Sequence, residues 1–304
     1  MIISFSRLSG FIIILAVFHT ARLAVAAAGD TTSSPLSRGS AAQLFVKGNE
    51  LYAEAKRIAS EGRGNDARAK FGEAEVVYEG LLAHGFVNWQ VQYNLGNAFY
   101  QQGALGKAIA CYRRAERLAP RREDIEFNLE KAKAEARDKE ALPRTPEYVR
   151  TLLFPYYRMS LNEVTSVGIG AYATFSVLLI LVVFVRTAWA KALCAIALAT
   201  TLALGATLAA KMFYEQRMGR GVVISDVCAV RFGHGLEYEK RFEVHDGAEF
   251  LVLGRYRDPQ TKQEWLKVRL LVELRQAKPP ADAEAEAMQA RAEGWVEAKD
   301  AELL

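Results

Sequence analysis

The sequence is poor in the two residue types that most often build cross-links and metal sites. Its 304 residues include 3 cysteines and 4 histidines. So few cysteines exclude a small fold stapled by disulfides, and they lie in three different segments, at Cys111, Cys194 and Cys228. We expect solvated loop side chains without ligand spacing at His84, His234 and His245. The sequence therefore predicts no metal centre and no cofactor.

Excess charge of one sign is also lacking. Lys and Arg number 39 against 35 Asp and Glu, a net charge of +4 that is too weak to suggest a nucleic-acid-binding protein. With 51% hydrophobic and 24% charged residues, bulk disorder is excluded. The sequence contains no nucleophile elbow, Walker loop, HExxH or CxxC motif. These absences argue against an enzyme.

The N-terminal residues have the pattern of a secretion signal. Arg7 precedes an apolar run at 8–18 that is too short to span a bilayer, and small residues follow. This order predicts a signal peptide at 1–28, with an uncleaved N-terminal anchor as the alternative. The small polar residues at 29–40 are expected to form a flexible leader.

Two longer stretches, 164–185 and 192–210, contain no charged residue. Each is long enough to cross a bilayer core of about 30 Å. A buried helix pair in a soluble domain is the alternative, but it would show polar residues on its outer face. We therefore predict a transmembrane hairpin with its turn at 186–191. Arg186 and Lys191 assign this turn to the cytoplasm, because basic residues of short loops stay inside.

The hairpin then places both flanking soluble segments outside the cytoplasm, and the signal peptide independently requires the same arrangement. The expected location is a bacterial cytoplasmic membrane, with both soluble domains on its periplasmic side. Three basic residues just beyond the second stretch, Lys211, Arg217 and Arg220, oppose this orientation. Glu215 offsets them little, since acidic residues contribute weakly to the rule.

A 34-residue period marks the segment 41–140. Tyr93-Asn-Leu recurs as Phe127-Asn-Leu, and this offset is the tetratricopeptide period. Residues 89–120 resemble one complete tetratricopeptide repeat, with signature positions at Leu95, Gly96, Phe99, Ala108, Tyr112, Ala115 and Pro120. Small residues at Gly96 and Ala108 let two helices cross closely, while Gly103 and Pro120 end them.

The repeat pattern has departures. Gln92 stands where the family has tryptophan, and Gly48 precedes the matching Gly96 by 48 residues rather than 34, which predicts a lengthened first repeat. In the third copy Glu130 replaces the glycine, so residues 123–139 are expected to form a capping helix. The prediction is a short all-α solenoid of two repeats and a cap.

Tetratricopeptide repeats typically bind extended peptides or partner helices on the face formed by their first helices. Here we expect this face to carry Tyr93, Asn94, Asn97, Tyr100, Phe127, Asn128 and Lys131. Asparagine offers both donors and an acceptor, so it can hold a peptide backbone or a carboxylate. The alternative is that the asparagines cap or solvate the helices and that the aromatic side chains pack between them.

Strand-like alternation begins after the second apolar stretch. β-Branched residues alternate over 221–231, and Asp246-Gly247 and Asp258-Pro259 are turn signals between later strands. Short strands at this spacing predict a small all-β barrel. Residues 220–304 resemble a bacterial SH3-type domain, whose closing Gly-Trp-Val appears at 294–296. A segment at 272–293 is inserted before it, unless the closing strand is misassigned.

SH3-like barrels bind peptides or cell-wall fragments through aromatic surfaces. Tyr238 and Tyr256 stand beside charged residues and are the expected binding surface. Trp265 and Phe250 stand among alternating apolar residues and are expected in the core.

The order of the segments is a signal peptide, a tetratricopeptide region, a linker at 141–163, a two-helix hairpin and an SH3-like domain. This multidomain α + β order resembles the BatE type of aerotolerance-operon protein over nearly the whole chain. The resemblance implies an envelope protein encoded beside von Willebrand A-domain membrane proteins and a MoxR-type AAA+ ATPase. It also implies a role in assembling or regulating a membrane complex in stress tolerance.

Two functional hypotheses follow. The first is a non-enzymatic adaptor, anchored in membrane lipid, whose repeat groove binds protein partners such as the von Willebrand A-domain proteins. The second is a cell-wall sensor whose SH3-like domain binds peptidoglycan. Neither hypothesis involves nucleic acid.

Overall fold

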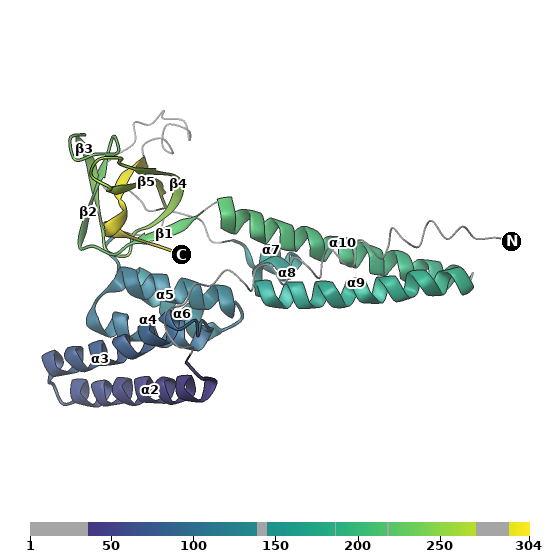
Figure 1. The fold of residues 1–304 in the computed structure, drawn as a ribbon, viewed down its shortest axis with the longest axis horizontal. Coiled ribbons are helices and arrows are strands. Elements are labelled where there is room, and N and C mark those ends of the chain that lie inside the picture. Colours follow the sequence, from purple (N-terminus) through teal and green to yellow (C-terminus); the bar gives the residue numbers. More distant parts are fainter. Residues whose placement is uncertain (1–35, 139–144, 186, 218, 272–291) are drawn as a thin grey trace. The chain divides into compact units, whose positions relative to one another are not determined.

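The structure is a computed structural model that describes residues 36–138, 145–185, 187–217, 219–271 and 292–304 (Figure 1). The predicted signal peptide, most of the predicted leader and most of the inserted segment lie outside these ranges. By its contacts, the chain from Ala42 to Leu304 forms one compact unit.

The described residues before the first apolar stretch form a helical region, as expected. Its main helices are α2 (Arg38–Ser60), α3 (Gly64–Ala83), α4 (Trp89–Gln102), α5 (Leu105–Leu118) and α6 (Glu123–Glu135). Helix α2 begins inside the segment expected as a leader. Asn88 caps α4 by accepting a hydrogen bond from the Val91 N–H at 2.8 Å. Gly103 ends α4 at a φ of 85°, a left-handed conformation that favours glycine.

The same close helix contact occurs in two successive repeats. A Cβ added to Gly48 would lie 2.7 Å from the Tyr78 ring, and one added to Gly96 would lie 2.7 Å from the Tyr112 ring. Tyr78 and Tyr112 are 34 residues apart, so they occupy equivalent positions although the first repeat is longer. These contacts confirm that the glycines let the paired helices approach closely.

The C-terminal region forms a separate antiparallel sheet domain. Its described strands are β1 (Arg220–Val223), β2 (Val227–Arg231), β3 (Lys240–His245), β4 (Glu249–Arg257), β5 (Glu264–Leu270), β6 (Glu293–Glu297) and β7 (Ala301–Leu303). They pair in the order β3-β2-β6-β5-β4-β1-β7, which leaves β3 and β7 as edges among the described strands. The sheet is therefore open, and the closed SH3-like barrel that we expected is not confirmed.

Residues 294–296, which we expected to form the closing strand unless it was misassigned, lie within β6, an interior strand of the sheet. Trp295 pairs with Lys267 of β5 on one side and with Arg231 of β2 on the other. Phe250 and Trp265 are buried, as predicted. The core of the sheet domain contains small and branched apolar residues around Phe250, namely Val223, Cys228, Val230, Val244, Ala248, Leu266, Val268, Leu270 and Val296.

Two described helices between these regions are apolar and long enough to cross a membrane. They are α9 (Leu161–Phe184) and α10 (Ala188–Arg217), and they pack against each other. Their large apolar side chains are mostly exposed on the protein surface. Membrane lipid would cover such side chains, so the two helices indicate membrane association. The predicted linker contains two short helices, α7 (Glu147–Leu152) and α8 (Phe154–Tyr157).

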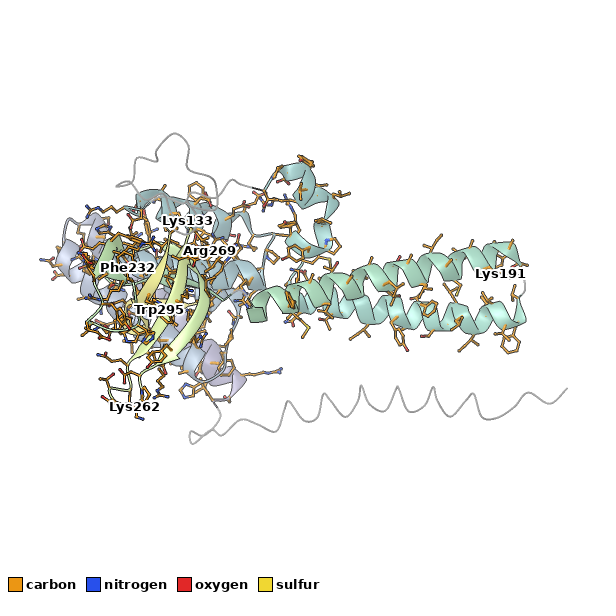
Figure 2. The ribbon with its side chains drawn as sticks, turned by 90° about the horizontal axis from the view of Figure 1, so that it is seen from above. Lys133, Lys191, Phe232, Lys262, Arg269 and Trp295 are labelled. Atoms are coloured by element: carbon orange, nitrogen blue, oxygen red, sulfur yellow. The ribbon has the colours of Figure 1, made fainter. Side chains whose placement is uncertain are left out.

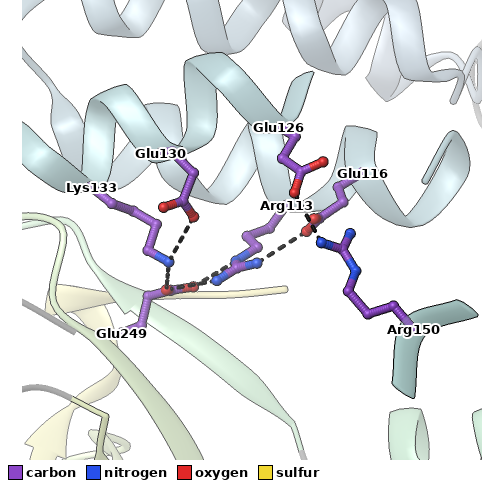
Figure 3. Close-up of polar contacts among 7 residues, drawn as sticks. All are labelled: Arg113, Glu116, Glu126, Glu130, Lys133, Arg150 and Glu249. Atoms are coloured by element: carbon purple, nitrogen blue, oxygen red, sulfur yellow. Dashed lines mark hydrogen bonds and ion pairs between the residues drawn. The ribbon is translucent and has the colours of Figure 1, made fainter. Parts of the chain in front are cut away.

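A buried ion pair joins helix α5 to strand β4 (Figure 3). The Arg113 guanidinium donates from Nε and Nη2 to the two carboxylate oxygens of Glu249, at 2.8 and 2.9 Å. The Glu249 side chain is 4% exposed. Lys133 of α6 adds a second cation, with its Nζ 3.7 Å from Glu249 Oε2. Burial acts to raise the pKa of Glu249, but Arg113 and Lys133 outweigh it and hold this pKa below its usual value.

Further polar contacts fix the same two elements against each other. The Gly106 N–H, in the first turn of α5, donates to Asp246 Oδ1 at 2.9 Å, so the sheet domain caps this helix. A Cβ added to Gly106 would lie 2.0 Å from the Val223 carbonyl oxygen, which leaves no room for a side chain. Arg114 of α5 also donates a hydrogen bond to the Glu302 carboxylate of β7 at 2.5 Å. Helix α5 is thus docked closely on the sheet domain.

Replacing Gly96 with alanine tests the close helix contact. The new methyl group would meet the Tyr112 ring at 2.7 Å, so Gly96→Ala should lower the free energy of unfolding by about 1–3 kcal/mol. Denaturant unfolding of the full chain in detergent, followed by circular dichroism, measures this change. The control is Gly80→Ala in α3. A Cβ added at Gly80 would meet no neighbouring atom within 4 Å, and alanine has a higher helix propensity than glycine. Equal stability of the two variants would contradict the contact.

A double-substitution cycle tests the ion pair. Glu249→Leu leaves Arg113 buried without its main partner, and it should lower the free energy of unfolding by about 3–5 kcal/mol. Adding Arg113→Met should restore most of this loss, because two apolar side chains of similar length replace the charged pair. Purely additive losses in the same unfolding measurement would show that the two side chains do not interact.

An acid titration gives a second reading of the ion pair. The pKa of Glu249 is lower in the folded chain than its ordinary value of 4.5. The stability it contributes is therefore fully present above pH 4.5 and is lost as the pH falls through the folded pKa. Glu249→Gln should flatten this part of the acid unfolding curve.

Candidate protein-binding site

A pocket of about 280 Å³ opens in the helical region where we predicted the binding face. It is lined by side chains from α2, α4, α5 and α6, namely Tyr52, Lys56, Tyr93, Asn97, Tyr100, Gln101, Tyr112, Asn128 and Lys131. Five of the seven predicted residues are among them. The other two, Asn94 and Phe127, do not line it; the Phe127 side chain is 69% exposed outside the pocket.

Hydrogen bonds inside the protein already occupy the asparagines of the pocket. Asn97 Oδ1 accepts from the Tyr112 hydroxyl at 2.8 Å and from Asn128 Nδ2 at 3.0 Å. Asn128 Nδ2 also donates to the Tyr93 hydroxyl at 2.9 Å. This network ties α4 to α5 and α6, so these amides have a structural role within the repeat.

Asn94 belongs to the equivalent network one repeat earlier. Asn49 Oδ1 accepts from the Tyr78 hydroxyl and from Asn94 Nδ2, both at 2.8 Å. Asn94 thus occupies the place that Asn128, 34 residues later, takes in the second network. In each case the asparagine links its helix to the preceding repeat.

The groups left to meet a ligand are tyrosines, lysines and one glutamine. Burial raises the pKa of Tyr52, Tyr93 and Tyr100, so their hydroxyls stay protonated at neutral pH, and those of Tyr52 and Tyr93 can donate to a ligand. Lys131 Nζ lies 4.8 Å from the centre of the Tyr100 ring. The Tyr100 hydroxyl donates to Glu135, which stands next to the pocket.

The described lining residues include two cations, Lys56 and Lys131, and no acidic side chain. Both lysines are exposed at the pocket surface. Aromatic walls, hydroxyl donors and two ammonium groups together suit an anionic group on an extended chain.

The sequence interpretation missed Tyr52, Lys56 and Gln101 as pocket residues, and it placed Tyr112 in the repeat signature and not on the binding face. A signal for Tyr52 was available, because the stretch at 45–52 matches 93–100 and aligns Tyr52 with Tyr100. Lys56 follows four residues later, which places it on the same face of α2. Gln101 has no such repeat signal.

The two predicted residues of the sheet domain come together around a histidine. The His234 ring centre lies 3.7 Å from that of Tyr256, 5.9 Å from that of Tyr238 and 5.2 Å from that of Trp295. Tyr238 is 41% exposed. We had expected a solvated side chain at His234. The structure instead packs this ring among three aromatic rings. We call these four residues the aromatic cluster; Figure 2 labels Trp295 within it.

Within the described ranges, no group of three or more His, Cys, Asp or Glu residues could hold a metal ion. The three cysteines are free, and Cys111 and Cys228 are buried. Burial raises the pKa of Cys228 to about 12, so its thiol stays protonated and unreactive.

Comparison with protein families identifies a tetratricopeptide repeat at residues 89–122. This range contains α4, α5 and the turn between them, and it confirms the repeat that we predicted at 89–120. No curated protein matches the chain. Tetratricopeptide repeats are typical of proteins that bind other proteins and act as non-enzymatic scaffolds. The chain therefore contains a protein-binding repeat of this class.

Substitutions in the pocket should separate structural from surface residues. Asn97→Ala leaves the Tyr112 hydroxyl and the Asn128 amide without their shared acceptor, so it should lower the free energy of unfolding by about 1–3 kcal/mol. Lys131→Ala removes an exposed side chain and should change it by less than about 0.5 kcal/mol. Thermal or denaturant unfolding of the full chain compares the two variants. An unchanged stability of Asn97→Ala would contradict the structural role of the network.

Proposed function

We propose that this chain is a membrane-anchored adaptor whose pocket between α2, α4 and α6 binds an anionic segment of a protein partner. The observation that supports this most directly is the pocket itself. Its described lining combines aromatic side chains with Lys56 and Lys131 and contains no carboxylate. The tetratricopeptide match at 89–122 independently favours a protein partner over a small molecule.

The partner segment is extended and carries a carboxylate. A pocket of about 280 Å³ has room for only a few side chains, so it would bind a short stretch of the partner's chain. Lys56 and Lys131 attract the negative charge, while Tyr52 and Gln101 offer hydrogen-bonding groups for its backbone. The paired asparagines hold the helices at the spacing that this recognition needs.

The two apolar helices anchor the adaptor in a bilayer. Lys211 of α10 donates to the Met159 carbonyl oxygen at 2.7 Å, so the outer ends of α9 and α10 lie at one level. This arrangement supports a hairpin that returns to its starting side. The two cations of the predicted turn, Arg186 and Lys191, favour a cytoplasmic turn and periplasmic flanking regions.

The order of segments resembles the BatE type of aerotolerance-operon protein, which suggests von Willebrand A-domain membrane proteins as partners in a stress-response complex. A cell-wall sensor is the second candidate, favoured by the exposed part of the aromatic cluster at Tyr238. In that role an SH3-like domain would bind peptidoglycan. Co-sedimentation of the full chain with purified cell wall separates the two candidates, since an adaptor need not co-sediment.

Photo-crosslinking from the pocket tests the adaptor. A photoreactive residue at Gln101 should trap a defined membrane protein in native membranes. Lys56→Glu with Lys131→Glu should abolish this product, because both cations that attract the carboxylate become anions. The matched control is Lys47→Glu with Arg68→Glu, which makes the same change in net charge at two exposed residues outside the pocket. An undiminished product in the pocket variant would refute the proposal.

A further inference from the structure

Helices α7 and α8 carry apolar side chains that the protein leaves uncovered. Tyr148 and Leu152 are 75% and 80% exposed, and Leu153 and Phe154 are 48% and 43% exposed. These four large apolar side chains fall within seven residues, and we call them the apolar patch. Clustered exposed apolar groups mark sites that a membrane or another molecule covers. We therefore expect another surface to bury these apolar side chains.

The charged residues of the same segment, in contrast, are paired within the protein. Arg158 donates to Glu147 at 2.5 Å, and Arg150 donates to Glu126 of α6 at 3.2 Å. Arg150 also lies 3.8 Å from Glu147. Each of these charged side chains thus has an ionic partner, although the Glu147 side chain remains 62% exposed.

The patch lies at the level where the two apolar helices end. Helix α8 packs against α10, and Lys211 near the end of α10 lies 5.6 Å from the centre of the Tyr156 ring. Lysine and tyrosine are enriched at membrane–water boundaries. Lys191 lies in the first turn of α10, at the opposite end of the helix pair (Figure 2), close to Trp189, which is 58% exposed. Both ends of the hairpin therefore carry the residues typical of such boundaries.

We propose that α7 and α8 lie in the boundary between lipid headgroups and acyl chains, with Tyr148, Leu152, Leu153 and Phe154 inserted. The occupant of the patch is membrane lipid, because α8 packs against α10 at the end of the apolar hairpin, whose exposed apolar side chains lipid would cover. Amphipathic segments bind membranes in the interfacial plane by placing their apolar groups among the lipids and their polar groups in water. The inference rests on the proposed insertion of the hairpin and adds a second, lateral contact with the membrane. This contact fixes the helical region close to the bilayer surface.

Fluorescence quenching in vesicles tests this contact. The full chain carries Cys194→Ala, and Cys111 and Cys228 are buried, so one introduced cysteine takes an environment-sensitive fluorophore. The protein is reconstituted in phosphatidylethanolamine and phosphatidylglycerol vesicles. With Leu152→Cys, nitroxide attached near the lipid headgroup should remove most of the fluorescence, while aqueous iodide should have little effect. Tyr148→Cys, at a second exposed position, should give the same result.

Two control positions make the outcomes distinct. Val76→Cys lies on α3, is 68% exposed, and should be quenched by iodide and not by lipid nitroxide. Ile180→Cys lies in α9 and reports on the hairpin. If lipid nitroxide quenches position 180 but not positions 148 and 152, the interfacial contact is wrong and the hairpin stands. If it quenches none of these, the proposed insertion itself is wrong. Shielding of 148 and 152 from both quenchers would assign the patch to a second copy of this chain, since the vesicles contain no other protein, and would overturn the inference.

Discussion

The buried pair of Arg113 and Glu249 constrains the rest of the molecule. It joins a helix that precedes the two apolar helices to a strand that follows them, and the two partners are 136 positions apart in the sequence. Such a pair is costly to break, because either charge left alone is buried without compensation. If the apolar helices cross a membrane, this contact requires both soluble regions on the same side. A hairpin of two crossings meets that requirement, and a single crossing does not.

Helix α5 connects this constraint to the candidate site. Arg113 faces the sheet domain, whereas the adjacent Tyr112 donates its hydroxyl to Asn97 beneath the pocket. The sheet domain also caps the N-terminus of the same helix through Asp246. Docking on the sheet therefore fixes the helix that forms the back of the pocket. A pocket held in this way would lose little conformational entropy on binding the partner segment that we propose.

How much the sequence could predict depended on the distance between interacting residues. The contact of Gly96 with Tyr112 was predictable, because a 34-residue repeat encodes it within 16 positions. The role of Asn94 was not, because its partner Asn49 lies in a first repeat whose extra length hides the alignment. No local pattern connects Arg113 with Glu249. Helices α7 and α8 are too short to show a helical period in the linker sequence. The open sheet was not predictable either, because pairing between strands that are distant in the sequence decides whether a sheet closes into a barrel.

The central claim is that the helical region and the sheet domain form one docked module. The most direct test is the distance between two spin labels, one at position 76 in α3 and one at position 262 in the turn between β4 and β5. Pulsed electron–electron double resonance measures the distribution of this distance. Both positions are exposed, and neither takes part in the contact between the two regions. The account predicts one narrow distance distribution in the full chain, which broadens when Glu249→Gln weakens the ion pair. A broad distribution in the unchanged protein would contradict it.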